Sequence, residues 1–199
     1  MPKPFDLPDH DTMRANLYAT LRRATPAELD TGEAWYDVAN TFAWGLAEKH
    51  DLSPHYAAGI IAALSPGCEW ERNLALAQRM AERGDCRHPY GNAIHKARAI
   101  WSGTHPEQVL GGDKVRSFYK NITTPWIEGP VTIDRHAVSC LVGRKVEGVP
   151  QRKGYYERLA DVFRDVAAEL GRPAHVVQAQ AWLAWRRLPA DPNQLTMEV

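Results

Sequence analysis

The clearest pattern in this chain of 199 residues runs from Leu110 to Ile122 and reads LGGDKVRSFYKNI. Its apolar residues Val115, Phe118, Tyr119 and Ile122 recur at i, i+3, i+4 and i+7. This spacing places them on one face of an α-helix. We therefore expect an amphipathic helix that begins after the glycine pair at positions 111 and 112.

Helical signals continue on both sides of this stretch. Thr25-Pro26 and Ser53-Pro54 are typical helix starts, with an N-cap residue followed by proline in the first turn. Gly84 and Gly171 follow apolar helical stripes, where glycine commonly ends a helix. No run alternates long enough to build a sheet, so we expect an all-α, compact multi-helix bundle. The expected helices cover about residues 26–46, 54–64, 69–83, 93–101, 106–110, 113–122, 134–142, 155–170 and 177–185, and a short non-helical run is expected near residues 123–133.

Length and composition favour one domain inside a cell. Hydrophobic residues make up 44% of the chain, and no apolar run is long enough for a membrane span. The first residues lack the apolar stretch of a signal peptide, and three cysteines make no disulfide framework. We expect a single all-α domain over residues 11–188 with loose tails at 1–10 and 189–199. The expected location is the cytoplasm, without a membrane partner.

The neutral total of 24 basic and 24 acidic residues conceals an uneven distribution. Residues 95–153 hold ten basic and five acidic side chains, whereas residues 1–94 hold nine and thirteen. A basic middle segment is typical of a surface that binds a polyanion. A solvated basic face without a partner is the alternative interpretation.

Lys114 is the first candidate for chemistry. A glycine pair directly before a helix lets the backbone approach a ligand, and the free N–H groups of the first turn attract an anion. A cation in the first turn of a helix is unfavourable because it opposes the helix dipole. The presence of Lys114 there is explained if it faces a phosphate or reacts. The alternative is an ordinary interhelical loop with a solvated lysine.

Asp134 is the second candidate, at the expected start of the helix over 134–142. A carboxylate fixed there could stabilise an oxocarbenium-like transition state or orient a water molecule. A plain N-cap is the alternative. His136, two residues later, could serve as a base or as a packed histidine.

The loop after the expected helix 54–64 is the third candidate. Ser65 begins it, and Trp70 and Asn73 share a face of the next helix. Such side chains could enter a duplex as a wedge or line a pocket. The alternative is a capping role for Ser65 and core packing for Trp70.

Metal and cofactor sites are not expected. Cys86 and His88 have no second pair at zinc spacing, and the chain contains neither a phosphate-binding Walker loop nor a dinucleotide fingerprint. We therefore predict no metal ion and no cofactor.

Taken in order, these segments resemble the helix-hairpin-helix (HhH-GPD) DNA glycosylase superfamily, which includes endonuclease III. The similarity covers about residues 35–145. Its motifs are Leu64-Ser65 after a buried helix, Lys96-Ala97 on a later helix, a glycine-rich hairpin ending at Lys114, and the apolar run that ends in Asp134-Arg135-His136. The chain also resembles uncharacterised proteins of actinobacterial phages, which would place it in the host cytoplasm.

The resemblance implies a DNA glycosylase-like enzyme that flips out a base and cleaves its glycosidic bond. Lys114 matches the nucleophile of members with lyase activity, and Asp134 matches their essential aspartate. Duplex DNA with a flipped base is the implied partner. The residues expected to contact DNA are Gly111, Gly112, Arg116, Lys120, Arg135 and Lys96, and those expected in a pocket or wedge are Ser65, Trp70, Asn73 and His136.

The sequence also departs from this family. The hairpin is about two residues short, Asp113 places a negative charge beside the expected phosphate, and three dispersed cysteines cannot form the four-cysteine iron–sulfur loop of endonuclease III. Two alternatives therefore stay open: a non-catalytic DNA-binding protein with a glycosylase fold, and a phage enzyme that modifies nucleotides or DNA in the same pocket.

Overall fold

The amphipathic stretch forms α7 (Asp113–Thr123) in the computed structural model, which describes residues 6–147 and 153–187. Gly112 is the N-cap of this helix and has a φ of 79°, a conformation that favours glycine. Phe118, Tyr119 and Ile122 are buried, as the apolar spacing predicts. The chain then runs without regular structure from residue 124 to 134, which confirms the expected non-helical run.

The described chain divides into two compact units within the stretch 11–188 that the sequence predicts as one domain. Unit 2 consists of residues 36–127, and unit 1 combines the described residues before Tyr36 with those after Ile127. The helix α2 (Pro26–His50) is continuous and contributes residues to both units.

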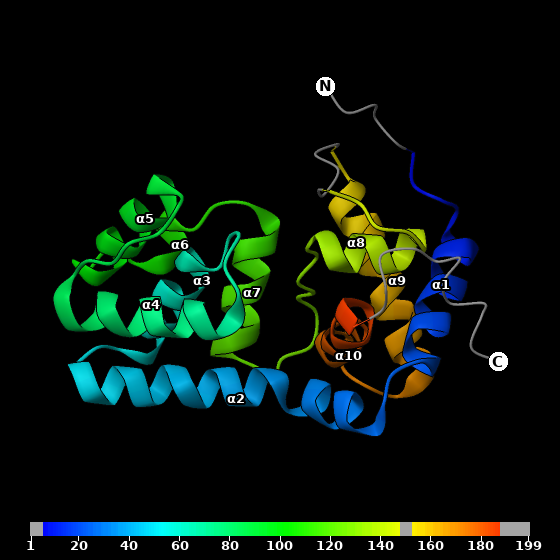
Figure 1. The fold of residues 1–199 in the computed structure, drawn as a ribbon, viewed down its shortest axis with the longest axis horizontal. Helices are drawn as coiled ribbons and strands as arrows, with labels where there is room; N and C mark the ends of the chain where they lie inside the picture. Colours follow the sequence, from blue (N-terminus) through cyan, green and yellow to red (C-terminus); the bar gives the residue numbers. More distant parts are fainter. Residues whose placement is uncertain (1–5, 148–152, 188–199) are drawn as a thin grey trace. The chain divides into compact units, whose positions relative to one another are not determined.

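Unit 2 is built around α3 (Pro54–Leu64), whose residues from Ala57 to Leu64 are all buried. A helix that is apolar on every side is stable only when neighbours cover it on every side. Four helices pack on α3, as Figure 1 shows: α4 (Trp70–Arg83), α5 (Gly91–Trp101), α6 (Pro106–Val109) and α7.

Unit 1 consists of the first part of α2 together with α1 (His10–Arg22), α8 (Arg135–Val142), α9 (Tyr155–Leu170) and α10 (Ala174–Arg187) (Figure 1). The helix α10 packs on α8, α9 and α1. Leu17, Leu141, Phe163 and Val177 are fully buried in the shared core.

The helix α1 is not among the helices that the sequence predicts. Asp9 caps it by accepting a 2.8 Å hydrogen bond from the Thr12 backbone N–H. Met13, Leu17 and Thr20 are buried at helical spacing, and Leu7 packs against the core of unit 1. Within the loose tail expected at residues 1–10, Leu7, Asp9 and His10 are thus part of or packed on this structure, whereas residues 1–5 and the tail expected at 189–199 lie outside the described residues.

The predicted all-α class is confirmed, because the described residues contain helices and no strand. Among these residues, none of the helices combines the length and apolar character that a membrane span requires.

Candidate nucleic-acid site

Asp134 lies half-buried at the N-terminus of α8 in unit 1. Its Oδ1 atom accepts hydrogen bonds from the backbone N–H groups of His136 at 2.9 Å and Ala137 at 2.8 Å. Its Oδ2 atom accepts a third bond, at 3.1 Å, from the indole Nε1 of Trp182 on α10. Both oxygen atoms are therefore held, one by the start of its own helix and one by a side chain from a different helix.

Trp182 links this carboxylate to a cluster of rings and cations. The guanidinium of Arg186 lies over the indole, 4.4 Å from the ring centroid, in a cation–π contact. The Trp35 ring lies 5.1 Å from that of Trp182, and the His136 ring lies 6.4 Å away in an edge-on arrangement. We call Asp134, His136, Trp35, Trp182 and Arg186 the Asp134 cluster.

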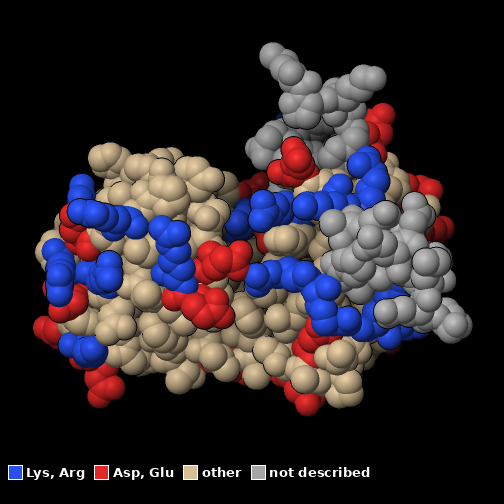
Figure 2. Space-filling view, in the orientation of Figure 1, with Lys and Arg blue, Asp and Glu red and all other residues tan. Residues whose placement is uncertain are grey.

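The surroundings of the Asp134 cluster are basic. Arg135 is exposed, and its Nε lies 3.4 Å from His136 Nε2. Figure 2 shows Lys and Arg side chains gathered over the region of α8 and α10 in unit 1. Exposed cations beside aromatic rings are the combination that binds phosphates and stacks on bases.

The hairpin before α7 belongs to unit 2. Gly111 is half-buried, Gly112 is exposed, and no side chain caps the helix. Arg116 is exposed, but its Nε donates a 2.9 Å hydrogen bond to the Leu110 carbonyl oxygen, so this expected DNA contact also ties the hairpin to α7. Lys114 is half-buried in the first turn.

Lys120, the other cation expected to contact DNA from α7, is exposed. Lys114 and Asp134, the two residues expected to carry catalysis, belong to different units. Each is therefore interpreted within its own unit.

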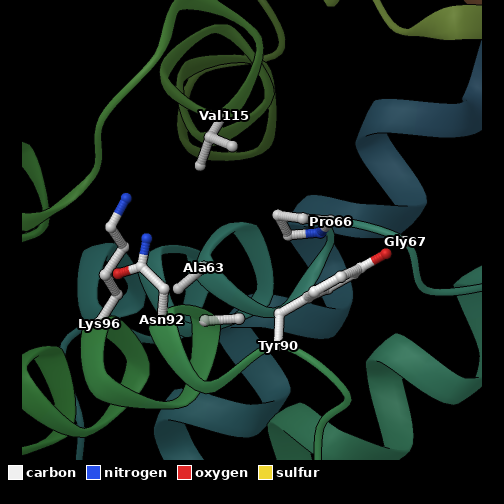
Figure 3. Close-up of a pocket in the computed structure, with 8 residues that line it drawn as sticks. Ala63, Pro66, Gly67, Tyr90, Asn92, Lys96 and Val115 are labelled. Atoms are coloured by element: carbon white, nitrogen blue, oxygen red, sulfur yellow. The ribbon is translucent and has the colours of Figure 1, made fainter. Parts of the chain in front are cut away.

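A pocket of about 380 Å³ lies within unit 2, between the end of α3, the start of α5 and α7. Figure 3 shows the side chains of Lys96 and Asn92 pointing in the same direction, toward Val115 on α7. Lys96, expected to contact DNA, is thus a pocket residue. The other residues that line the pocket are Ala63, Pro66, Gly67, Tyr90 and Ala93.

Three of the residues expected to form a wedge or pocket lie in unit 2, at the end of α3 and on α4. Ser65 ends α3 and donates a 2.9 Å hydrogen bond to the Ala62 carbonyl oxygen, which agrees with its alternative role as a cap. The Trp70 ring packs edge-on against Phe118, 6.3 Å between centroids, as the core interpretation expects. Asn73 is 2% exposed, and its Oδ1 has no hydrogen-bond partner among the residues described.

Metal ligands do not gather in the described part of the chain: within it, no three His, Cys, Asp or Glu side chains lie together in a way that could hold an ion.

A family model matches residues 6–189. The chain belongs to DUF7178, a family of unknown function. No curated protein and no solved structure matches this DUF7178 member. Its function must therefore be argued from its own residues.

The sequence interpretation of this DUF7178 member missed two sets of residues. Trp182 and Arg186 are four positions apart on α10, a spacing that could have indicated their shared face, but their sequence gave no sign of Asp134 as a partner. Tyr90 and Asn92 lie at the start of α5 without any motif of their own. Only the folded chain brings Tyr90 against Gly67 and places Asn92 in the same pocket.

Proposed function

We propose that this protein is a DNA glycosylase-like enzyme that extrudes a base or modified base and cleaves its glycosidic bond. The observation that carries the proposal is the Asp134 carboxylate, held by two backbone amides and one indole N–H. A simple N-cap needs only the backbone amides of the first turn. The third bond, from a residue 48 positions away, fixes the second oxygen as well.

Fixed charge at this place suits the chemistry of glycosidic cleavage. When the bond between C1′ and the base nitrogen breaks, the electron pair leaves with the base and positive charge develops on the sugar. A carboxylate that is already oriented stabilises this charge without reorganising during the reaction. A water molecule then attacks C1′, while the departing base takes up a proton.

The rings and cations around Asp134 supply binding. Trp35, Trp182 and His136 offer faces and edges for an unstacked base, and Arg135 and Arg186 offer positive charge for the phosphates beside it. The order of motifs that resembles the HhH-GPD superfamily agrees with this use of the site. The resemblance also implies an amine nucleophile at Lys114, which would form a Schiff base at C1′ and give lyase activity. Because Lys114 belongs to unit 2 and Asp134 to unit 1, adduct formation and base release are tested separately.

The proposal is tested with a panel of duplex oligonucleotides that contain damaged bases and modified pyrimidines. We expect mass spectrometry to detect a free base from at least one substrate. Borohydride reduction during the reaction should trap the protein on that DNA, and Lys114→Gln should abolish the trapped adduct while leaving base release measurable. Base release without any adduct would restrict the activity to hydrolysis and contradict the role proposed for Lys114.

A non-catalytic DNA-binding protein is the second candidate. The observation that favours it is the hairpin, in which Arg116 bonds to the Leu110 carbonyl oxygen and Asp113 is exposed. DNA binding that persists while the whole panel yields neither free base nor adduct would favour this candidate over the enzyme.

A further inference from the structure

The pocket in unit 2 combines an apolar lining with a few polar groups at one side. Ala63, Pro66, Ala93 and Val115 supply the apolar part, and Lys96 and Asn92 supply the polar groups. Its volume of about 380 Å³ falls within the range of small-molecule sites, which are typically apolar with a few oriented polar groups. These features indicate a ligand with an apolar body and a polar edge.

Tyr90 forms a wall of this pocket that is still open to a ligand. Tyr90 is 55% exposed, and its ring contacts the His88 ring at 5.7 Å between centroids, so much of the residue is still open to a ligand. Gly67 allows this position, because a Cβ atom there would lie 2.5 Å from Tyr90 Cε2. An exposed ring at the edge of a pocket is a platform on which a heterocyclic base can stack.

Lys96 gives the pocket its charge. It is half-buried, and among residues 6–147 and 153–187 no carboxylate forms an ion pair with it. A Cβ atom on Gly111 would lie 3.6 Å from Lys96 Nζ, so the ammonium group lies close to a hairpin that has no side chain at this point. An ammonium group donates hydrogen bonds and accepts none, so it selects ligand edges that carry acceptors.

We propose that this pocket binds one heterocyclic base whose edge carries hydrogen-bond acceptors, as the O6 and N7 atoms of guanine do. Lys96 donates to those acceptors, Asn92 completes the polar edge, and Tyr90 covers the face of the ring. Adenine fits less well, because its N6 amino group would direct a donor at the ammonium. An apolar lining favours the body of a base over a bare phosphate, which loses its hydration there.

This inference rests on the nucleic-acid part of the proposed function, but not on catalysis by Asp134. Its test measures binding of GMP, AMP and inorganic phosphate to the full chain by calorimetry or ligand-observed NMR. GMP and AMP share their sugar and phosphate, so the difference between them reports on the base. We expect GMP to bind about ten-fold more tightly than AMP, within the range measured for lysine contacts to guanine edges.

Two variants assign this preference to the pocket. Lys96→Met keeps the length of the side chain and should remove the preference for GMP. Lys49→Met, at an exposed position in the last turn of α2, removes the same charge outside the pocket and should leave the preference unchanged. Asn92 is exposed, and Asn92→Leu should weaken GMP binding about two- to ten-fold. This variant tests the pocket even if Lys96→Met folds poorly.

Equal binding of GMP, AMP and inorganic phosphate, lost in Lys96→Met, would overturn the proposal in favour of a phosphate site. A GMP preference that persists in both pocket variants would overturn it as well. A single-stranded oligonucleotide with one guanine among abasic spacers distinguishes a base within DNA from a free nucleotide as the natural ligand. Tighter binding of this oligonucleotide than of GMP indicates a base presented by DNA. Weaker binding indicates a free nucleotide. Asp134→Asn should keep the GMP preference, so failure of base excision and failure of this site are separable.

Discussion

The two oxygen atoms of Asp134 have different partners, one set local and the other tertiary. Oδ1 satisfies the backbone of α8, whereas Oδ2 receives the Trp182 indole N–H. The capping role follows from the sequence, because Asp before an apolar helical stripe is a strong start signal. The contact with Trp182 is tertiary and 48 residues distant, so no local pattern could predict it.

A second residue, Cys140, makes the stability of the protein change with pH in the alkaline range. Complete burial raises the pKa of its thiol from 9.0 to about 12. Below pH 9 the thiol keeps its proton in both the folded and the unfolded chain, so it adds no pH dependence. Between pH 9 and about 12 only the unfolded chain loses this proton, so stability falls as the pH rises.

We therefore expect the free energy of unfolding, measured by urea denaturation, to decrease between pH 9 and pH 10.5. In Cys140→Ala the decrease should be shallower, although the cavity lowers stability at every pH. An unchanged slope in this variant would show that the buried thiol does not cause the effect.

At the scale of elements, helix ends followed from local signals. Gly84 and Gly171 end α4 and α9 in the left-handed conformation, and Pro26 and Pro54 begin α2 and α3. The helix α1 was missed because its apolar face is short and mixed, with Thr20 as its third buried residue. Burial of that face comes from α8, α9 and α10, which is information that the local sequence does not hold.

Two glycines on α2 give a matched pair of predictions about helix packing. A Cβ atom on Gly32 would lie 2.7 Å from Gln180 Cα and 2.8 Å from Gln180 N, so Gly32→Ala must push α2 away from the backbone of α10. We expect a loss of about 1–3 kcal/mol in chemical denaturation. Gly45→Ala places its methyl group where nothing lies within 4 Å, and it should stabilise the protein by up to about 1 kcal/mol. Equal effects of the two changes would contradict the close contact at Gly32.

The amphipathic face of α7 gives the next prediction. The Phe118 ring is buried and packs edge-on against Tyr36 at 6.2 Å and Trp70 at 6.3 Å. Phe118→Ala should cost about 3–5 kcal/mol of unfolding free energy, because it leaves a cavity among these rings. Lys120→Ala on the exposed face should change stability by less than about 0.5 kcal/mol. A much smaller loss of unfolding free energy in Phe118→Ala would show that this ring is not part of the core of unit 2.

At the scale of the whole molecule, the division into two units could not be predicted. The boundary near Trp35 and Tyr36 falls inside the continuous helix α2, where the sequence has no glycine- or proline-rich linker. The other boundary, near Ile127 and Glu128, falls in the non-helical run that the sequence did predict. A domain boundary depends on which long-range contacts form, and helical periodicity does not report those contacts.

Under the proposed function, the uneven charge predicts that DNA binding depends on salt. If about five phosphates contact Lys or Arg, log K should fall with log salt at a slope of about −4.5. Lys120→Ala should make the slope less steep by about 0.9 and weaken binding to all sequences alike. Lys49→Ala, in the acidic first part of the chain, should leave the slope unchanged. DNA binding that does not change with salt would contradict a role for the basic segment in phosphate contacts.

The central claim is that the Asp134 carboxylate lowers the barrier to glycosidic cleavage. The most direct measurement compares the single-turnover rate of base release by the wild-type protein and by Asp134→Asn, on the best substrate of the panel. Asn caps helices about as well as Asp, so the variant should keep its stability to within roughly 1 kcal/mol. Loss of the charge should slow base release about 100-fold or more. An equal rate in a variant of unchanged stability would show that Asp134 is only the cap of α8, and would contradict the account.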